Sequence, residues 1–85
     1  MTNEQKYKMF SKLLKTLLPQ KFPEIDSVEV KDMSEKYFLR NGLFDVLIYV
    51  DGTEQEQEDE IKEYIDELLD HTGEKFNLRI EYITL

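Results

Sequence analysis

Few side chains in this sequence could carry chemistry, and the first of them is a single histidine. His71 lies near the end of an acidic segment with helical spacing. A histidine in the last turn of a helix interacts favourably with the helix C-terminus, and Glu67 stands four residues earlier, where it can pair with His71. Nucleophilic catalysis would need a serine, cysteine or threonine near a base, and the chain has no cysteine. We interpret His71 as structural and expect no catalytic residue and no enzyme activity.

Two aspartates, Asp45 and Asp51, are the next candidates. They resemble the metal-binding acids of nucleotidyltransferases, but that family carries a Gly-Ser turn before its strand, and this sequence has none there. Six residues of strand span about 20 Å, which is too far for two ligands of one ion. We therefore expect no metal site and no cofactor.

A third candidate is a row of carboxylates spaced along residues 54–72, namely Glu56, Glu60, Glu63, Glu67 and Asp70. A specific calcium site would instead need a loop that wraps six to eight oxygens around the ion. A helix is normally polar opposite its apolar stripe. The row is therefore interpreted first as a solvated acidic face.

The first elements that must position these groups are a helix and a short strand. Thr2 and Gln5 have the spacing of a capping box, and apolar residues then recur at helical spacing up to Leu18. Because proline removes a donor and disfavours helical geometry before it, Pro19 predicts the end of a helix over residues 3–18. The alternation around Val28 predicts a strand over residues 27–32.

The segment that follows is ambiguous. Asn41-Gly42 is a strong signal for a two-residue hairpin, which predicts a strand over 36–40 paired with a strand over 43–51. That pairing would place Val28 opposite a residue beyond Asp51. The first strand must therefore break or bulge near residues 33–35, and we favour one such strand followed by the hairpin. Because residues 43–50 are apolar on both faces, apart from Asp45, we expect a central strand.

The second half predicts a helix over 54–72, with Thr53 and Glu56 as a capping box and Gly73 as a left-handed cap, and then a strand over 76–83. The fold class is therefore α+β in the order αββαβ, a small three-stranded mixed sheet with both helices on one face. We expect the last strand to run parallel to the first and beside it. The predicted core contains Leu17, Val46, Ile48, Ile65, Leu68, Leu78 and Ile80.

This order of elements, with VEVKDM and FDVLIYV as paired strands, resembles the core of ribosome-binding factor A and of type II KH domains. The resemblance covers most of the chain and implies the fold. Those families approach RNA through a Gly-x-x-Gly turn or a small-residue kink, and this sequence lacks both. Their RNA-facing surface is basic, whereas residues 54–72 carry a single lysine, Lys62. A short acidic chain of this kind also resembles proteins of phages and mobile elements.

Length and charge set the remaining bounds. The 85 residues allow one domain, residues 1–85, and the net charge is −8. Residues 1–21 carry five lysines and one glutamate, so the acidic excess lies in residues 22–85. Most of this surface would repel nucleic acid, so no nucleic-acid partner is expected. The absence of cysteine, of an export signal and of a long apolar run predicts a cytoplasmic protein without a membrane segment.

By exclusion, the sequence favours a small non-enzymatic interaction or adaptor domain. If both helices cover one sheet face, the other face presents an apolar patch, which usually marks a partner site or a dimer interface. Its predicted residues are Tyr37, Phe38, Leu47 and Tyr49. One helix on each face, or a loop over the second face, would remove this patch. The first alternative is a decoy or inhibitor whose acidic helix imitates phosphate charge, and the second is a KH-like RNA-binding domain using the lysines of residues 3–18.

Overall fold

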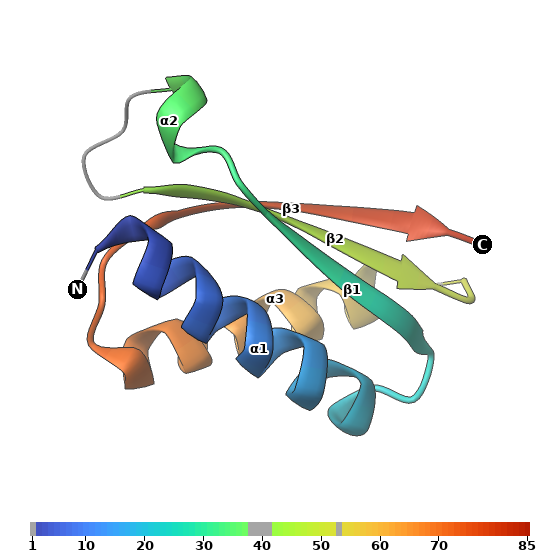
Figure 1. Cartoon of the computed structure of the whole chain (residues 1–85). Helices are drawn as coiled ribbons and strands as arrows, with labels where there is room; N and C mark the ends of the chain where they lie inside the picture. The colour runs from blue at the N-terminus through green and yellow to red at the C-terminus, as the bar shows by residue number, and fades with distance from the viewer. Residues whose placement is uncertain (1, 38–41, 53) are drawn as a thin grey trace.

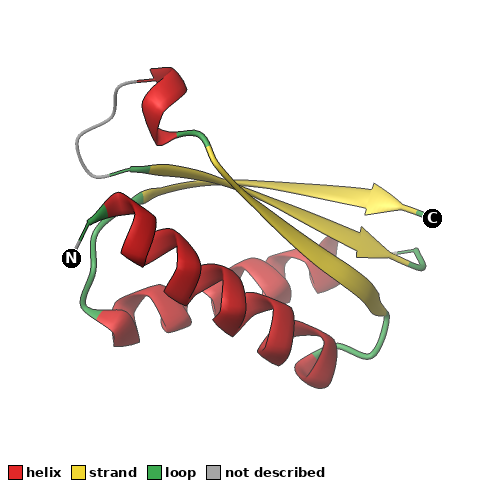
Figure 2. Cartoon of the chain, in the orientation of Figure 1, coloured by secondary structure: helices red, strands yellow, loops and turns green. Residues whose placement is uncertain are grey.

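Two long helices lie against one face of a three-stranded sheet in a computed structural model of the chain (Figures 1 and 2). The structure describes residues 2–37, 42–52 and 54–85, without the side chains of Glu35 and Tyr37. Its elements, in order, are α1 (Asn3–Lys21), β1 (Ile25–Asp32), α2 (Ser34–Tyr37), β2 (Leu43–Val50), α3 (Gln55–Thr72) and β3 (Asn77–Thr84). The predicted α+β class is confirmed, and so is the order αββαβ of its main elements, to which α2 is an addition.

Helix α1 begins as predicted and ends later than predicted. The side chain of Thr2 accepts a hydrogen bond from the backbone of Gln5, and the Gln5 side chain accepts one from the backbone of Thr2, which forms the capping box. Pro19 does not end the helix. It removes one donor, but the Phe22 N–H still donates to the Leu18 carbonyl at 2.9 Å. Both of these residues are buried, and their burial favours one further turn.

The core face of α1 differs from the predicted one by one residue. Phe10, Leu14 and Leu18 are fully buried and follow one another at a spacing of four. Leu17 was predicted to be core and is only partly buried. The reason is the orientation of the helix, because the stripe through Leu14 and Leu18 turns toward the sheet and leaves Leu17 on its flank.

Residues 36 and 37, the described part of the predicted hairpin strand, belong to α2 and do not pair with β2. Instead, β1 pairs directly with β2 in antiparallel fashion, with Val28 opposite Ile48. The register irregularity lies between Ile25 and Ser27 rather than near residues 33–35. One extra residue there switches which side chains face the core, so that Ile25 and Val28 are both buried.

A helical turn, α2, takes the place of the first part of the predicted hairpin strand. Asp32 and Ser34 hydrogen-bond to each other locally, and such bonds compete with strand pairing. Gly42 adopts a left-handed φ of 93°, which favours glycine. The remainder of the predicted strand and turn, residues 38–41, lies outside the described residues.

Strand β2 is central, as predicted. The last strand was predicted to lie beside the first and to run parallel to it, and both parts of that prediction were wrong. The sheet order is β1-β2-β3, and β3 runs parallel to β2 and therefore antiparallel to β1. Helix α3 carries the chain back to the end of the sheet where β2 began, so the strand after it runs parallel to the strand before it. Strand β2, which is apolar on both faces, therefore pairs with a strand on each side.

Helix α3 follows the prediction closely. It runs from Gln55 to Thr72 and ends at Gly73, whose φ of 72° is left-handed. Its N-cap is Glu54, without a side-chain capping bond, and Thr53 of the predicted capping box lies outside the described residues. None of the helices within residues 2–37, 42–52 and 54–85 is long and apolar enough to cross a membrane.

The core lies between the helices and the sheet. Val46, Ile48 and Ile65 are fully buried, as predicted. Leu68, Leu78 and Ile80 are partly buried and pack against the same cluster. Aromatic contacts close its ends, with ring centroids 4.8 Å apart between Phe10 and Phe76 and 5.8 Å apart between Phe22 and Tyr64.

The helix face of α1 can be tested with two adjacent leucines. Leu18→Ala should lower the free energy of unfolding by about 2–5 kcal/mol, because it leaves a cavity at a fully buried site. Leu17→Ala should cost less than about 1 kcal/mol, because that side chain is partly solvated already. Urea unfolding followed by circular dichroism measures both. Equal losses at the two positions would mean that the stripe is misassigned.

Candidate functional site

The sheet face that no long helix covers is the candidate site. Side chains alternate across a strand, and those opposite the core belong to every second residue of β1, β2 and β3. The strand register arranges most of them in three rows across the sheet: Lys31, Asp45 and Arg79; Glu29, Leu47 and Glu81; and Ser27, Tyr49 and Ile83. A further pair, Leu43 and Asn77, stands at the end of the same face, where Leu43 is buried. The first row is therefore charged, the second has a leucine between two acidic residues, and the third has an apolar pair beside a serine.

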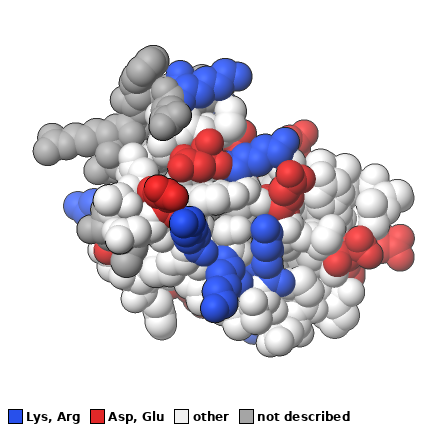
Figure 3. Space-filling view, viewed as in Figure 1, with Lys and Arg blue, Asp and Glu red and all other residues white. Residues whose placement is uncertain are grey.

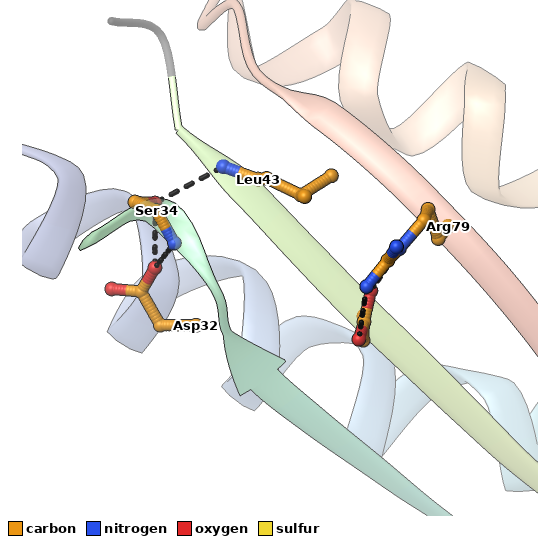
Figure 4. Close-up of polar contacts among 5 residues, drawn as sticks. Asp32, Ser34, Leu43 and Arg79 are labelled. Carbon is orange, nitrogen blue, oxygen red and sulfur yellow. Dashed lines mark hydrogen bonds and ion pairs between the residues drawn. The ribbon is translucent and has the colours of Figure 1, made fainter. Parts of the chain in front are cut away.

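The charged row is held by a two-point ion pair. Arg79 Nε and Nη2 donate to the two carboxylate oxygens of Asp45 at 2.7 and 2.9 Å (Figure 4). The Arg79 side chain is 52% exposed, so the pair contributes little to stability. It does fix the direction of both charges at one end of the face. It also occupies the carboxylate of Asp45, one of the two aspartates considered as metal ligands.

The apolar part of the face is small and bordered by acids. Leu47, Tyr49 and Ile83 are each partly buried, with Leu47 and Tyr49 on β2 and Ile83 beside Tyr49 on β3. Leu47 lies between Glu29 and Glu81 in the register. Both predicted partner-face residues on β2 are therefore on the uncovered face. The other two, the side chain of Tyr37 and the residue Phe38, lie outside what the structure describes.

Tyr49 connects the apolar part to its acidic border. Its hydroxyl donates to Glu29 Oε2 at 3.2 Å. Desolvation raises the pKa of Tyr49 above its usual 10.0, and the hydrogen bond to Glu29 and the charges of Glu29 and Glu81 raise it further. A partner that brings positive charge to this border would therefore meet an already negative environment.

The predicted acidic face is present as a separate surface on α3. Its five carboxylates, at Glu56, Glu60, Glu63, Glu67 and Asp70, are all exposed. Among the residues that the structure describes, no three His, Cys, Asp or Glu side chains come together as a metal site. His71 is exposed in the last turn of α3, and none of the ion pairs found among the described residues joins it to Glu67.

One serine, Ser34, hydrogen-bonds to a carboxylate, as a catalytic serine could, and was examined as a possible nucleophile. The Ser34 hydroxyl donates to Asp32 Oδ1 at 2.6 Å and accepts from the Leu43 N–H at 3.0 Å (Figure 4). Ser34 is buried, and within the part of the chain that the structure describes its side-chain partner is the carboxylate of Asp32 rather than a histidine. The Asp32–Ser34 pair lies at the end of the β1–β2 hydrogen-bond ladder, next to the bond from the Met33 N–H to the Leu43 carbonyl at 2.8 Å. Its role is therefore structural.

A second tyrosine joins the sheet to α3 on the core side. The Tyr82 hydroxyl donates to the Glu58 carbonyl at 2.8 Å. Burial raises the pKa of Tyr82 to about 12, with smaller contributions from the negative charges of Glu58 and Asp59. Folding therefore favours the neutral form of the Tyr82 phenol.

Comparison with protein-family models, with curated proteins and with solved structures gave no match. The resemblance to ribosome-binding factor A and type II KH domains thus stays a prediction. The open face was only partly recognised from sequence. Ile83, Glu29 and Glu81 were missed as neighbours of Leu47, although Ile83 follows Glu81 by two residues and shares its outward direction. Which residues stand side by side depended on the strand register.

The Ser34 group gives a stability test. Ser34→Ala should cost about 1–3 kcal/mol, because it leaves the buried Leu43 N–H without an acceptor. Ser27→Ala, at an exposed site at the other end of the β1–β2 pair, should change the free energy of unfolding by less than about 0.5 kcal/mol. Chemical denaturation of both variants measures the difference. Two small and equal effects would contradict the structural role of Ser34.

Tyr82 gives a pH test. Because its pKa is raised from 10.0 to about 12, its contribution to stability should be complete below pH 10 and be lost as the pH rises toward 12. In Tyr82→Phe the fall in stability over this range should be shallower than in the parent chain. Ultraviolet titration should also lose its latest tyrosinate phase. An unchanged late phase in Tyr82→Phe would contradict this assignment.

Proposed function

We propose that this chain is a small non-enzymatic protein-interaction domain that binds another protein through the open face of the sheet. The observation that carries the proposal is the contiguous group of Leu47, Tyr49 and Ile83 on a face that neither long helix covers (Figure 1). Apolar side chains that lie together on a surface commonly mark a partner site.

The charges around this group favour a partner different from the chain itself. Glu29 and Glu81 stand on either side of Leu47. If two copies packed face to face with their strands aligned, these carboxylates would meet the same carboxylates of the second copy. Like charges brought together in an interface oppose association. The proposed partner therefore presents an apolar side chain flanked by lysine or arginine.

The dimensions of the face indicate that the partner also contacts its rim. Three strands of eight residues cover roughly 26 by 14 Å, which is about half of the roughly 800 Å² that each side of a standard interface buries. Figure 1 shows α2 rising beyond the end of the sheet on this side. A partner seated on Leu47 would reach α2 as well, which extends the contact.

A second candidate function uses the acidic face of α3. Five exposed carboxylates along one helix support a role as a decoy that occupies a basic nucleic-acid-binding protein. This role would not need the open face, so the two candidates predict different sensitive residues.

The decisive variant is Leu47→Glu, which places a charge in the centre of the proposed interface. It should weaken partner binding by at least about tenfold while the circular dichroism spectrum stays that of the parent chain. Thr16→Glu is the matched control, because it adds the same charge at an exposed site on α1. The partner is first isolated by affinity capture, and the purified pair is then measured by calorimetry and by amide shifts at Leu47 and Ile83.

Other outcomes would replace this proposal with a named alternative. A dimer in light scattering that Leu47→Glu dissociates would make a second copy the occupant of the face. Binding that survives Leu47→Glu but is lost on changing Glu60, Glu63 and Glu67 to glutamine would favour the decoy. Unfolding of Leu47→Glu would show that this side chain belongs to the core and that the face is not open.

A further inference from the structure

We propose a second interaction surface, separate from the open face, in which the outer edge of β3 and the groove between β3 and α3 bind an extended polypeptide segment. The segment would add a fourth strand to the sheet and carry lysine or arginine at every second position. Its elements are an open strand edge, a groove beside that edge, and the charge of the groove wall.

The backbone of β3 leaves one side of the strand open. Asn77 N–H donates to the Gly42 carbonyl and Leu85 N–H donates to the Val50 carbonyl, each at 2.9 Å. Successive residues of a strand point their backbone groups to opposite sides, so the even-numbered residues between these two point away from β2. They are Leu78, Ile80, Tyr82 and Thr84. Among the described residues, no hydrogen bond reaches their backbone groups.

The opposite edge of the sheet is less accessible. At β1, the Tyr7 hydroxyl donates to the Val30 carbonyl at 2.8 Å, in the middle of the edge. Helix α1 packs along this strand. An added strand would have to displace Tyr7, whereas at β3 it would find its backbone partners available. Exposed edges of this kind bind extended segments by main-chain hydrogen bonds.

A groove lies directly beside the β3 edge. Leu78, Ile80 and Tyr82 form one side of it, and the outer surface of α3 forms the other, through Gln55, Glu58, Asp59, Lys62 and Asp66. The groove has a volume of about 430 Å³. Side chains of an added strand that point to the core side of the sheet would enter this groove. Those on the other side would extend the open face.

The α3 wall of the groove is acidic. Glu58, Asp59 and Asp66 carry negative charge, and the single lysine, Lys62, is paired with Asp66 at 3.0 Å. The negative charges of Glu58 and Asp59 also contribute to the raised pKa of Tyr82 on the opposite wall. A lysine or arginine in the groove could lay its aliphatic stem on Leu78 and Ile80 and place its charge at Asp59.

A second copy of the chain fits this site poorly. If two β3 edges paired with each other, each would bring Leu78, Ile80 and Tyr82 rather than a basic residue to the groove of the other. The acidic walls of the two α3 helices would also approach each other. The chemistry of the groove therefore favours a basic segment from another protein.

The test uses a capped eight-residue peptide that alternates lysine and threonine, with the isotope-labelled full-length chain. Amide shifts on adding the peptide should be confined to β3 and α3, and amide hydrogen exchange at Leu78, Ile80 and Tyr82 should slow by at least about tenfold. A peptide of the same charge with alternate amides methylated should bind about tenfold more weakly, because it cannot pair with the edge. A peptide with glutamate in place of lysine should not bind.

Two charge-reversed variants locate the site. Asp59→Lys should weaken binding of the lysine peptide by about tenfold, and Glu67→Lys, an equal change on α3 outside the groove, by much less. Leu47→Glu should leave peptide binding unchanged, so this inference can fail independently of the proposed function. If Asp59→Lys and Glu67→Lys weakened binding of the lysine peptide equally, or if amide methylation did not weaken it, the binding would be non-specific electrostatic attraction. Slow, concentration-dependent exchange at Ile80 without peptide would show that a second copy occupies the edge. Any of these results would overturn the proposal.

Discussion

The fold depends on one strand that must bury apolar side chains against two helices at once. Phe44, Val46, Ile48 and Val50 of β2 are all fully buried, and each such side chain contributes roughly 1.5–3 kcal/mol on burial. Because β2 is central, β1 and β3 pair with its two sides and extend the same layer. Helices α1 and α3 then cover this layer through Leu14, Leu18, Ile61 and Ile65. A chain of 85 residues has material for one such core and not for a second.

The two surfaces proposed for binding both follow from the presence of a single core. A single pair of helices covers a single sheet face, so the side chains of alternate residues remain on the other one. A sheet of three strands also has two edges, and α1 approaches only the edge of β1, where Tyr7 bonds to Val30. Figure 3 shows the side of the molecule that α1 occupies, where lysines gather over the helix, and Lys8, Lys12 and Lys15 of α1 are exposed. Acidic residues of α3 line the groove beside the other edge, so the two edges of the sheet differ in charge as well as in accessibility.

Several polar groups in this chain complete the fold. The Asp32–Ser34 pair ends β1 and satisfies the backbone of Leu43, and among the described residues no buried side-chain nitrogen or oxygen lacks a hydrogen-bond partner. Asp45 is paired with Arg79 across two strands. Two residues that could have carried chemistry, Ser34 and Asp45, are thus engaged in structural contacts.

The sequence by itself determined the elements whose signals are local. Repeated apolar spacing located α1 and α3, Thr2 with Gln5 located the first cap, Gly73 located the last, and the two-sided apolar character of residues 43–50 identified the central strand. It also placed Leu47 and Tyr49 on one face, because alternation along a strand is a local property. Three features were decided only by the tertiary structure: the extension of α1 through Pro19, the register of β1 on β2 with the helical turn α2 after it, and the position of β3 beside β2. In each of them a local preference competed with burial or pairing between residues far apart in the sequence. Long-range contacts won because the free energy of a shared core exceeds that of a single turn or cap, and no local pattern records which distant partner a strand will meet.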